Sequence, residues 1–217
     1  MNVLLAGGAG FIGSHTAAEL LIAGHDVFVI DNLSNSYRTA LEGPEKLSKK
    51  KLVFHETDLR DYQSILKFSR DKRIDAIIHL AGYKSVGESV LNPIAYFDNN
   101  LISTLNLCKL VEELGIKNFV FSSSATVYGN PEKMPIDESF SISEALSPYA
   151  ESKVINETIL KALEVLRNNL NVVSLRYFNP AGAHPSGLIG EASRHRVTNL
   201  IPVLSKIAVG AQSEFVM

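Results

Sequence analysis

Short, almost continuous apolar segments alternate with longer stretches of helical periodicity along most of the chain. Strands covered on both faces show this near-continuous pattern, and the alternating order predicts a parallel, doubly wound α/β sheet with right-handed crossovers. The expected strands are residues 3–6, 26–30, 52–55, 76–80, 118–122 and 172–176. The expected helices are residues 11–23, 61–72, 93–114, 149–168 and 199–209.

Glycine and proline mark several of the expected helix ends. Gly24 and Gly115 stand where a helix C-terminus favours a left-handed residue, and Pro93 suits a first helical turn. After Pro180 the alternation gives way to a polar stretch, and residues 214–217 resemble the start of another strand. We therefore expect one α/β domain with part of a second region behind it.

Composition excludes several classes of protein. The 217 residues are 46% hydrophobic and carry a net charge of −2, which does not fit a strongly basic nucleic-acid binder. A single cysteine cannot form an internal disulfide, and no apolar run approaches the roughly 18 residues of a membrane span. The N-terminus lacks a signal-peptide pattern. We expect a cytoplasmic protein that associates with neither nucleic acid nor membrane.

A glycine-rich turn follows the first expected strand and opens the first helix. Gly7 can make the tight turn, Gly10 lets the backbone approach a pyrophosphate, and Gly13 permits close helix packing. The unpaired N–H groups and positive dipole end of the helix then face the phosphates. Glycine spacing alone is weak, but its placement between a strand and a helix predicts a dinucleotide site.

The next strand ends supply further candidate cofactor contacts. Asp31, at the end of the second strand, can accept both ribose hydroxyls and would repel the additional phosphate of NADP, which favours NAD. Its alternative role is to cap a turn with Asn32. Asp58, followed by Leu59, can bind the adenine amino group or serve as an ordinary helix N-cap. The small side chains near the end of the fourth strand would let the cofactor pass closely; this segment is Leu80, Ala81 and Gly82.

Three residues at the end of the fifth strand and in the helix that follows form a candidate acid–base group. Tyr149 and Lys153 are four residues apart and share a helix face, and Ser124 ends the strand. A neighbouring ammonium and a cationic nicotinamide would both lower the pKa of the tyrosine from its usual value of about 10. Tyr149 could then act as a general acid/base, with Ser124 holding the reacting hydroxyl. The alternative is an ordinary surface Tyr and Lys.

Several motifs taken together make the chain similar to a known family, the UDP-hexose 4-epimerases of the extended short-chain dehydrogenase/reductase superfamily. The matching segments are GGAGFIGSHT from Gly7, DNLSNS from Asp31, GYKSVGES from Gly82, DNN from Asp98, SSSATVYG from Ser122 and RYFNPAGAHPSG from Arg176. The resemblance implies a Rossmann-type domain over residues 1–178 and the start of a substrate-binding region over residues 179–217.

The resemblance also implies an activity and a set of binding residues. The activity is NAD-dependent interconversion of UDP-galactose and UDP-glucose, a step of galactose metabolism, through a 4-keto sugar. Implied cofactor contacts, besides those above, are Phe11, Ile12, Asn32, Asn35, Ser36, Lys84, Asn99, Ser122, Tyr149, Lys153, Tyr177 and Phe178. Implied substrate contacts are Lys84, Ser124, Tyr149, Asn179 and Asn199. Phe178 could instead be a core residue.

Some positions depart from the family pattern. Related 4,6-dehydratases carry an acidic pair where this chain has Ala125 and Thr126, so we do not expect elimination of water. Family members are longer, and most of their small C-terminal domain has no counterpart here. The loop over residues 192–198 also differs. Alternative functions are therefore an epimerase for UDP-N-acetylhexosamine or UDP-uronic acid, or a catalytically silent NAD-binding fragment.

The remaining residues suggest structural roles. The six histidines show no metal-ligand spacing on a shared element, so we expect no metal. Cys108 follows the apolar pattern of its helix and is expected in the core. The resemblance further implies a homodimer through helices 93–114 and 149–168.

Overall fold

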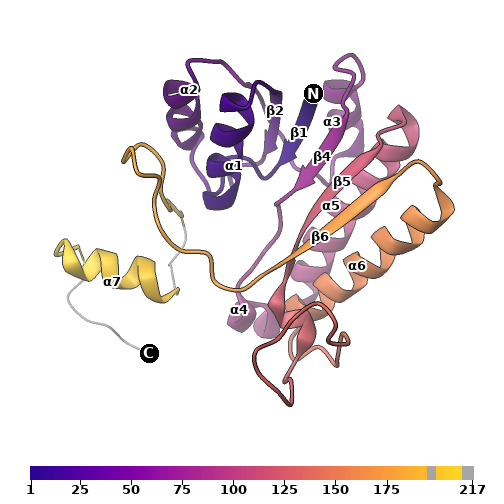
Figure 1. Cartoon of the computed structure of the whole chain (residues 1–217), viewed down its shortest axis with the longest axis vertical. Helices are drawn as coiled ribbons and strands as arrows, with labels where there is room; N and C mark the ends of the chain where they lie inside the picture. Colours follow the sequence, from indigo (N-terminus) through magenta and orange to yellow (C-terminus); the bar gives the residue numbers. More distant parts are fainter. Residues whose placement is uncertain (195–198, 212–217) are drawn as a thin grey trace.

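The computed structural model describes residues 1–194 and 199–211, and its centre is a six-stranded sheet (Figure 1). All five strand pairings are parallel, and the strand order is β3-β2-β1-β4-β5-β6. The strands are β1 Asn2–Ala6, β2 Asp26–Asp31, β3 Val53–Glu56, β4 Ala76–His79, β5 Asn118–Ser124 and β6 Asn171–Tyr177. All six expected strands are therefore confirmed, as is the parallel, doubly wound sheet.

Helices cover both faces of this sheet. The longer helices of the chain are α1 Phe11–Ile22, α3 Tyr62–Ser69, α5 Pro93–Leu114, α6 Pro148–Leu166 and α7 Leu200–Ala208, of which α7 lies apart from the sheet (Figure 1). α1 and α2 lie on one face, whereas α3, α5 and α6 lie on the other (Figure 1). Four short elements were not expected, namely η1 Arg38–Leu41, α2 Glu42–Ser48, α4 Val86–Leu91 and η2 Ala125–Tyr128. Gly43, Pro44 and Gly87 lower helix propensity there, which explains why the sequence pattern hides α2 and α4.

The helix ends follow the expected chemistry. Pro93 occupies the first turn of α5, and Gly115 caps its C-terminus with a left-handed φ of 66°. Gly24 has a φ of 91° directly after the C-cap of α1. These three residues confirm the expected helix boundaries.

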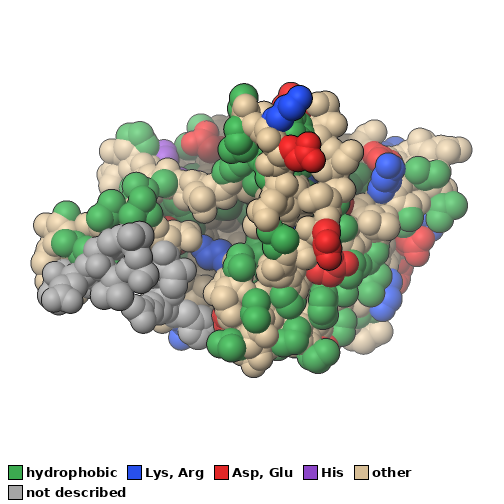
Figure 2. All heavy atoms as spheres, turned by 90° about the horizontal axis from the view of Figure 1, so that it is seen from below, with side chains coloured by type: hydrophobic (Ala, Val, Ile, Leu, Met, Phe, Trp, Pro, Cys, Tyr) green, Lys and Arg blue, Asp and Glu red, His purple; other side chains and the backbone are tan. Residues whose placement is uncertain are grey.

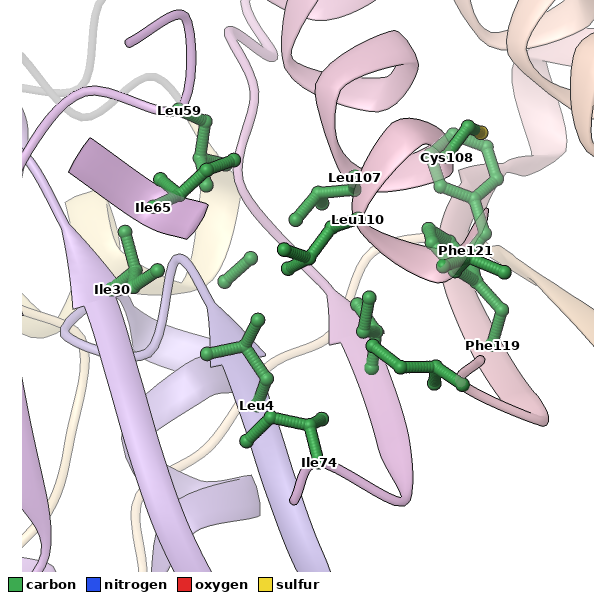
Figure 3. Close-up of a cluster of buried hydrophobic side chains, with 14 of the residues drawn as sticks. Leu4, Ile30, Leu59, Ile65, Ile74, Leu107, Cys108, Leu110, Phe119 and Phe121 are labelled. Carbon is green, nitrogen blue, oxygen red and sulfur yellow. The ribbon is translucent and has the colours of Figure 1, made fainter. Parts of the chain in front are cut away.

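The larger core lies between the sheet and the helices α3, α5 and α6 (Figure 3). Leu4 and Phe119 contribute from the strands, and Leu107 and Leu110 from α5. Cys108 is buried in this cluster, as expected, and burial raises the pKa of its thiol to about 12. A fully buried leucine contributes about 2 kcal/mol, so this packing holds β1, β4 and β5 in fixed register.

The two outer strands are less covered than the sequence pattern suggests. Val53 on β3 and Val173 on β6 remain 46% and 50% exposed. On β6, Val172 packs against the core beside α6, so Val173 and Leu175 face the opposite side of the sheet. Burial on both faces therefore holds for the central strands only.

The chain after β6 returns to the other side of the molecule, where it contacts α2 and the segment after β2 (Figure 1). We call residues 183–194 the return segment. Ile189 is buried, and a Cβ at Gly43 would lie 2.5 Å from the carbonyl oxygen of Leu188. Arg194 donates to the carbonyl oxygen of Ser36. The strand suspected near residues 214–217 lies outside the described residues.

In the described ranges, no helix combines the length and apolar character that crossing a bilayer requires.

Candidate active site

The candidate residues gather at the edge of the sheet where the strands end. Parallel strands place their carboxyl ends on one side, and ligands of open α/β sheets lie beyond that side. Figure 2 views the molecule from this edge and shows a hollow between its two parts. The glycine turn after β1 lies on one side of the edge, and the ends of β5 and β6 lie on the other (Figure 1).

The glycine turn has the geometry that a close-packed phosphate loop needs. Gly7 has a φ of 83°, and a Cβ there would lie 2.5 Å from the amide nitrogen of Ala81. A Cβ on Gly13 would lie 2.3 Å from the carbonyl oxygen of Gly7. Around Gly10, by contrast, the nearest atom to an added Cβ is that same oxygen, at 3.4 Å. Two glycines are thus required by contacts within the protein, while Gly10 leaves the start of α1 open to a ligand.

Asp31 stabilises two loops, the glycine turn before α1 and the segment that follows β2. Its carboxylate accepts hydrogen bonds from the amide of Ala9 (3.0 Å), the amide of Leu33 (2.9 Å) and the hydroxyl of Ser36 (2.9 Å). The bond to Leu33 is a local turn, so the alternative turn role is present in the structure. The remaining lone pairs leave the predicted contact with ribose hydroxyls open.

Asp58 is held in place by a neighbouring cation and is not a helix cap. The cap of α3 is Asp61, which accepts from the amide of Ser64, so the alternative role of Asp58 as an N-cap is wrong. Asp58 instead accepts from Arg60 and Asn32. The hydrogen bonds from Arg60 lower the pKa of Asp58 to about 2, so its carboxylate stays charged and able to accept.

Leu59 and the residues after β4 present backbone to the site. The Leu59 side chain is buried in the core, so any contact with a cofactor would use its main chain. Gly82 has a φ of 151°, and a Cβ there would lie 3.1 Å from Asn100 Oδ1 and 3.8 Å from Lys153 Nζ. The end of β4 thus closely approaches Lys153, one of the predicted catalytic residues, as its small residues suggest.

The three predicted catalytic residues lie together at the end of β5 and the start of α6. Ser124 ends β5, and Tyr149 and Lys153 lie one turn apart on α6, with all three side chains at most 9% exposed. The Lys153 ammonium donates to the carbonyl oxygen of Ser122 at 2.7 Å and lies 5.8 Å from the centre of the Tyr149 ring. The alternative of a surface Tyr–Lys pair is wrong, because both side chains are buried.

The ionisation of this group differs in one respect from the expectation. Burial raises the pKa of Tyr149, and the hydrogen bond with Ser124 opposes that rise only in part. Burial also lowers the pKa of Lys153 to about 8, while the negative charge of Glu157 acts in the opposite direction. The protein groups alone therefore do not lower the pKa of Tyr149 towards neutral pH, because desolvation disfavours its phenolate.

Behind this group lies a set of charged residues that the sequence analysis missed. Glu157 accepts two hydrogen bonds from Arg176, at 3.1 and 2.8 Å, and one from the Ser123 hydroxyl. His79 is fully buried beside Lys153, and its Nδ1 has no hydrogen-bond partner among the described residues. Glu157 follows Lys153 by four positions, so helical spacing could have revealed it.

The other predicted contacts vary in burial. Phe178 is 62% exposed, so its alternative assignment to the core is wrong. Lys84 is exposed and pairs with Glu191 at 3.5 Å. The remaining residues fall into three groups: Ser36 and Asn99 are buried, Phe11, Ile12, Ser122, Tyr177 and Asn199 are partly exposed, and Asn32, Asn35 and Asn179 are exposed. The loop that differs from the family pattern lies in part, at residues 195–198, outside the described residues.

One further feature lies away from this edge. A cavity of about 260 Å³ lies near the starts of β5 and β6, at the opposite edge of the sheet, where Lys117 and Arg167 are among its lining residues. Among residues 1–194 and 199–211, no cluster of His, Cys, Asp and Glu could hold a metal ion.

A parallel sheet with a glycine turn after β1, an acidic end to β2 and a Ser–Tyr–Lys group on β5 and α6 defines a Rossmann-type domain with an acid–base site. Comparison with known proteins agrees with this class. The chain belongs to the NAD dependent epimerase/dehydratase family, which it matches over residues 3–216.

Three similar proteins are named UDP-glucose 4-epimerase. A UDP-glucose 4-epimerase of Bacillus subtilis is 48% identical over 97% of this chain and 62% of its own length. The enzyme uge1 of Schizosaccharomyces pombe is 46% identical over 96% of this chain and 60% of its own. The crystal structure of UDP-glucose 4-epimerase from Bifidobacterium longum in complex with NAD+ and UDP superposes with a TM-score of 0.96 at 45% identity, covering 99% of this chain and 64% of that one. This chain thus spans 60–64% of the length of these relatives.

Proposed function

We propose that this chain supplies the NAD-binding and catalytic part of a UDP-glucose 4-epimerase, an isomerase that interconverts UDP-galactose and UDP-glucose. The observation that carries the proposal is the convergence of Ser124, Tyr149 and Lys153 in one buried group, at the same edge of the sheet as the glycine turn. Simple nucleotide binding does not require an acid–base group. The names of the similar proteins point to the same reaction.

The residues present fit an NAD molecule along the edge of the sheet. Gly10 leaves the N-terminus of α1 open towards a pyrophosphate, and the Asp31 carboxylate suits an adenosine ribose without the 2′-phosphate of NADP. When bound, NAD would supply reversible hydride transfer at carbon 4 of the sugar, on either face of the ring. Tyr149 and Lys153 would lie at the nicotinamide end, next to Gly82.

The side chains of this group would then move the proton. Tyr149 takes the proton of the sugar 4-hydroxyl, and Ser124 holds that hydroxyl by a hydrogen bond. The Lys153 ammonium favours the phenolate by its charge, against the desolvation that raises the tyrosine pKa. After the 4-keto sugar has rotated within the site, Tyr149 returns the proton to the product. The Ser124 hydroxyl oxygen also accepts two hydrogen bonds from Thr126, one from its amide (3.2 Å) and one from its hydroxyl (2.9 Å).

The direct experiment is to mix the purified chain with UDP-galactose, add no cofactor, and follow the anomeric signals by proton NMR. Appearance of UDP-glucose would support the epimerase function, and would mean that NAD regenerated in each cycle stays bound and copurifies. Replacing Tyr149 with Phe should reduce the rate by about 10³-fold, since general acid–base catalysis contributes about that much. NAD released on denaturation should be unchanged in this variant.

The matched control is Tyr62→Phe. This change also removes a tyrosine hydroxyl, but on α3, where the Tyr62 hydroxyl donates to Glu113 at 2.6 Å. This variant should epimerise at the wild-type rate. Bound NAD without turnover in the wild-type chain would contradict the proposed function and favour the alternative of a catalytically silent NAD-binding fragment. Turnover of UDP-N-acetylhexosamine or UDP-uronic acid, but not of UDP-galactose, would favour the related epimerases.

We also propose how the chain is organised and where it works. Residues 1–178 would bind NAD, and residues 179–217 would begin the substrate-binding region, with Asn179 and Asn199 near the UDP. Exposed apolar residues on α5, such as Ile94 and Leu105, support a homodimer through α5 and α6. The single, buried cysteine supports a reducing, cytoplasmic setting.

A further inference from the structure

Three charged side chains lie out of water behind the proposed catalytic tyrosine. Lys153 and Glu157 on α6 are 5% and 9% exposed, and Arg176 on β6 is partly buried against them. Burying an isolated charge is costly, so each of these groups needs an opposite charge or well-placed hydrogen bonds. With two cations and one carboxylate, the arrangement depends on Glu157.

The Glu157 carboxylate is fixed by two strands. Ser123 on β5 donates to Oε1, and Arg176 on β6 donates to both oxygens from its Nε and Nη2 atoms. Arg176 is itself held by the Tyr128 hydroxyl at 2.9 Å and lies over the Tyr128 ring. A two-pronged guanidinium–carboxylate pair of this kind has little freedom to rotate. The carboxylate therefore has one defined position beneath α6.

Lys153 receives less support from its own contacts. Its ammonium donates to a neutral acceptor, the carbonyl oxygen of Ser122, at 2.7 Å. Glu157 lies one helical turn further along α6, on the same face. Its negative charge opposes the desolvation of the ammonium, which otherwise lowers the pKa of Lys153. Consecutive residues of β5, Ser122 and Ser123, thus fix the cation and its counter-charge.

The groups on the other packed elements do not replace this counter-charge. His79 on β4 is fully buried, and burial lowers its pKa to about 3, so it is neutral at working pH. Arg176 on β6 has the same sign as Lys153, and its charge is matched by Glu157. Tyr149, on α6 itself, is neutral until it gives up its proton.

We propose that Glu157 is a positioning residue, whose carboxylate, fixed by Ser123 and Arg176, keeps the Lys153 ammonium charged beside Tyr149. The inference rests on the proposed epimerase function for its consequence, because a neutral Lys153 would no longer favour the tyrosine phenolate. It goes beyond the Ser–Tyr–Lys group, since Glu157 would touch neither sugar nor cofactor.

The test is a direct titration of Lys153 without substrate. Lysines carrying ¹³C at Cε are followed by NMR from pH 6 to 11, and the Lys153 signal is identified by its loss in Lys153→Met. We expect the wild-type signal to titrate near pH 8. In Glu157→Gln the midpoint should move to lower pH, so that the charged fraction at pH 8 falls from about half to a minority. The pH above which epimerisation falls off should move in the same direction.

Two controls separate charge from structure. Glu151→Gln removes an exposed carboxylate from the first turn of α6 and should leave the Lys153 midpoint unchanged. Arg176→Lys keeps both charges but loses the two-pronged geometry, so it should lower stability and lower the midpoint by less than loss of the carboxylate does. An unchanged midpoint in folded Glu157→Gln overturns the proposal.

An unchanged midpoint in Arg176→Lys also overturns the proposal, and this result can be obtained even where Glu157→Gln does not fold. Absence of turnover in the wild-type chain, with Lys153 titrating as expected, would overturn the epimerase function alone.

Discussion

The two ends of the candidate site are built by different means. At the nucleotide end, backbone contacts decide the geometry, because Gly7 and Gly13 lie where a Cβ would meet main-chain atoms at 2.5 Å or closer. At the catalytic end, buried ionisable side chains decide it, and Lys153 and Glu157 are both under 10% exposed. Substitutions should therefore act through sterics and folding at the first end, and through charge and pH at the second.

The largest effect is expected from Gly13→Ala at the nucleotide end. The added Cβ would lie 2.3 Å from the Gly7 carbonyl oxygen and 2.7 Å from the Gly8 Cα, and backbone atoms cannot move away cheaply. We expect the free energy of unfolding in urea to fall by about 3 kcal/mol, at any pH. Gly87→Ala is the control, since that glycine is helical with open space around it and should be neutral or up to about 1 kcal/mol stabilising. Equal effects of the two changes would contradict the steric account.

At the catalytic end, Lys153→Met should change the dependence of stability on pH. The folded-state pKa of Lys153 is about 8, against an ordinary value of 10.5, so between these values the unfolded chain binds more protons than the folded one. The wild-type chain therefore gains stability from Lys153 as pH rises through this window, by about 2 kcal/mol after allowance for the coupled Glu157. The difference between wild type and Lys153→Met, measured by urea unfolding at pH 7.5 and 10, should shift by this amount. A constant difference would show that Lys153 is not desolvated.

A smaller effect on the free energy of unfolding is expected at acid pH from His79, which is buried beside Lys153. Its pKa is lowered from 6.5 to about 3, so the unfolded chain takes up a proton below pH 6.5 while the folded chain does not. Stability should therefore fall by about 1.5 kcal/mol between pH 6.5 and 5, and His79→Leu should remove this loss. Thr104 keeps its bond to the Asn100 carbonyl oxygen, which limits the cost of the change. His25→Gln, near the N-terminus, should keep the full acid sensitivity; a loss of it there would point to another group.

The same contrast explains how much could be predicted from the sequence. Strands and glycine positions follow from local patterns, and the Tyr149–Lys153 spacing follows from the helical repeat, so all of these were predicted. The pairing of Glu157 with Arg176 joins two elements, and nothing in either segment alone indicates it. Likewise, the choice of Asp61 over Asp58 as the helix cap depends on Arg60 holding the latter.

Exposure was the other property that the sequence pattern could not decide. Phe178 is apolar and follows a strand, yet it lies at an edge of the sheet where neighbouring elements leave it open. The pKa of Tyr149 depends on its burial, which no spacing rule reports. Predictions based on periodicity therefore succeeded for the long elements and for a core residue such as Cys108, but not for side chains at the ends of strands.

The return segment also bears on the order in which the molecule can be completed during synthesis. Arg194 donates to the Ser36 carbonyl oxygen, and the two residues are 158 positions apart in the chain. A ribosome adding about 5–20 residues per second needs roughly 10–30 s to make the intervening chain. The loop after β2 thus emerges long before its covering segment exists. The contact of that loop with the return segment therefore forms late, whereas β1 and β2 can pair early.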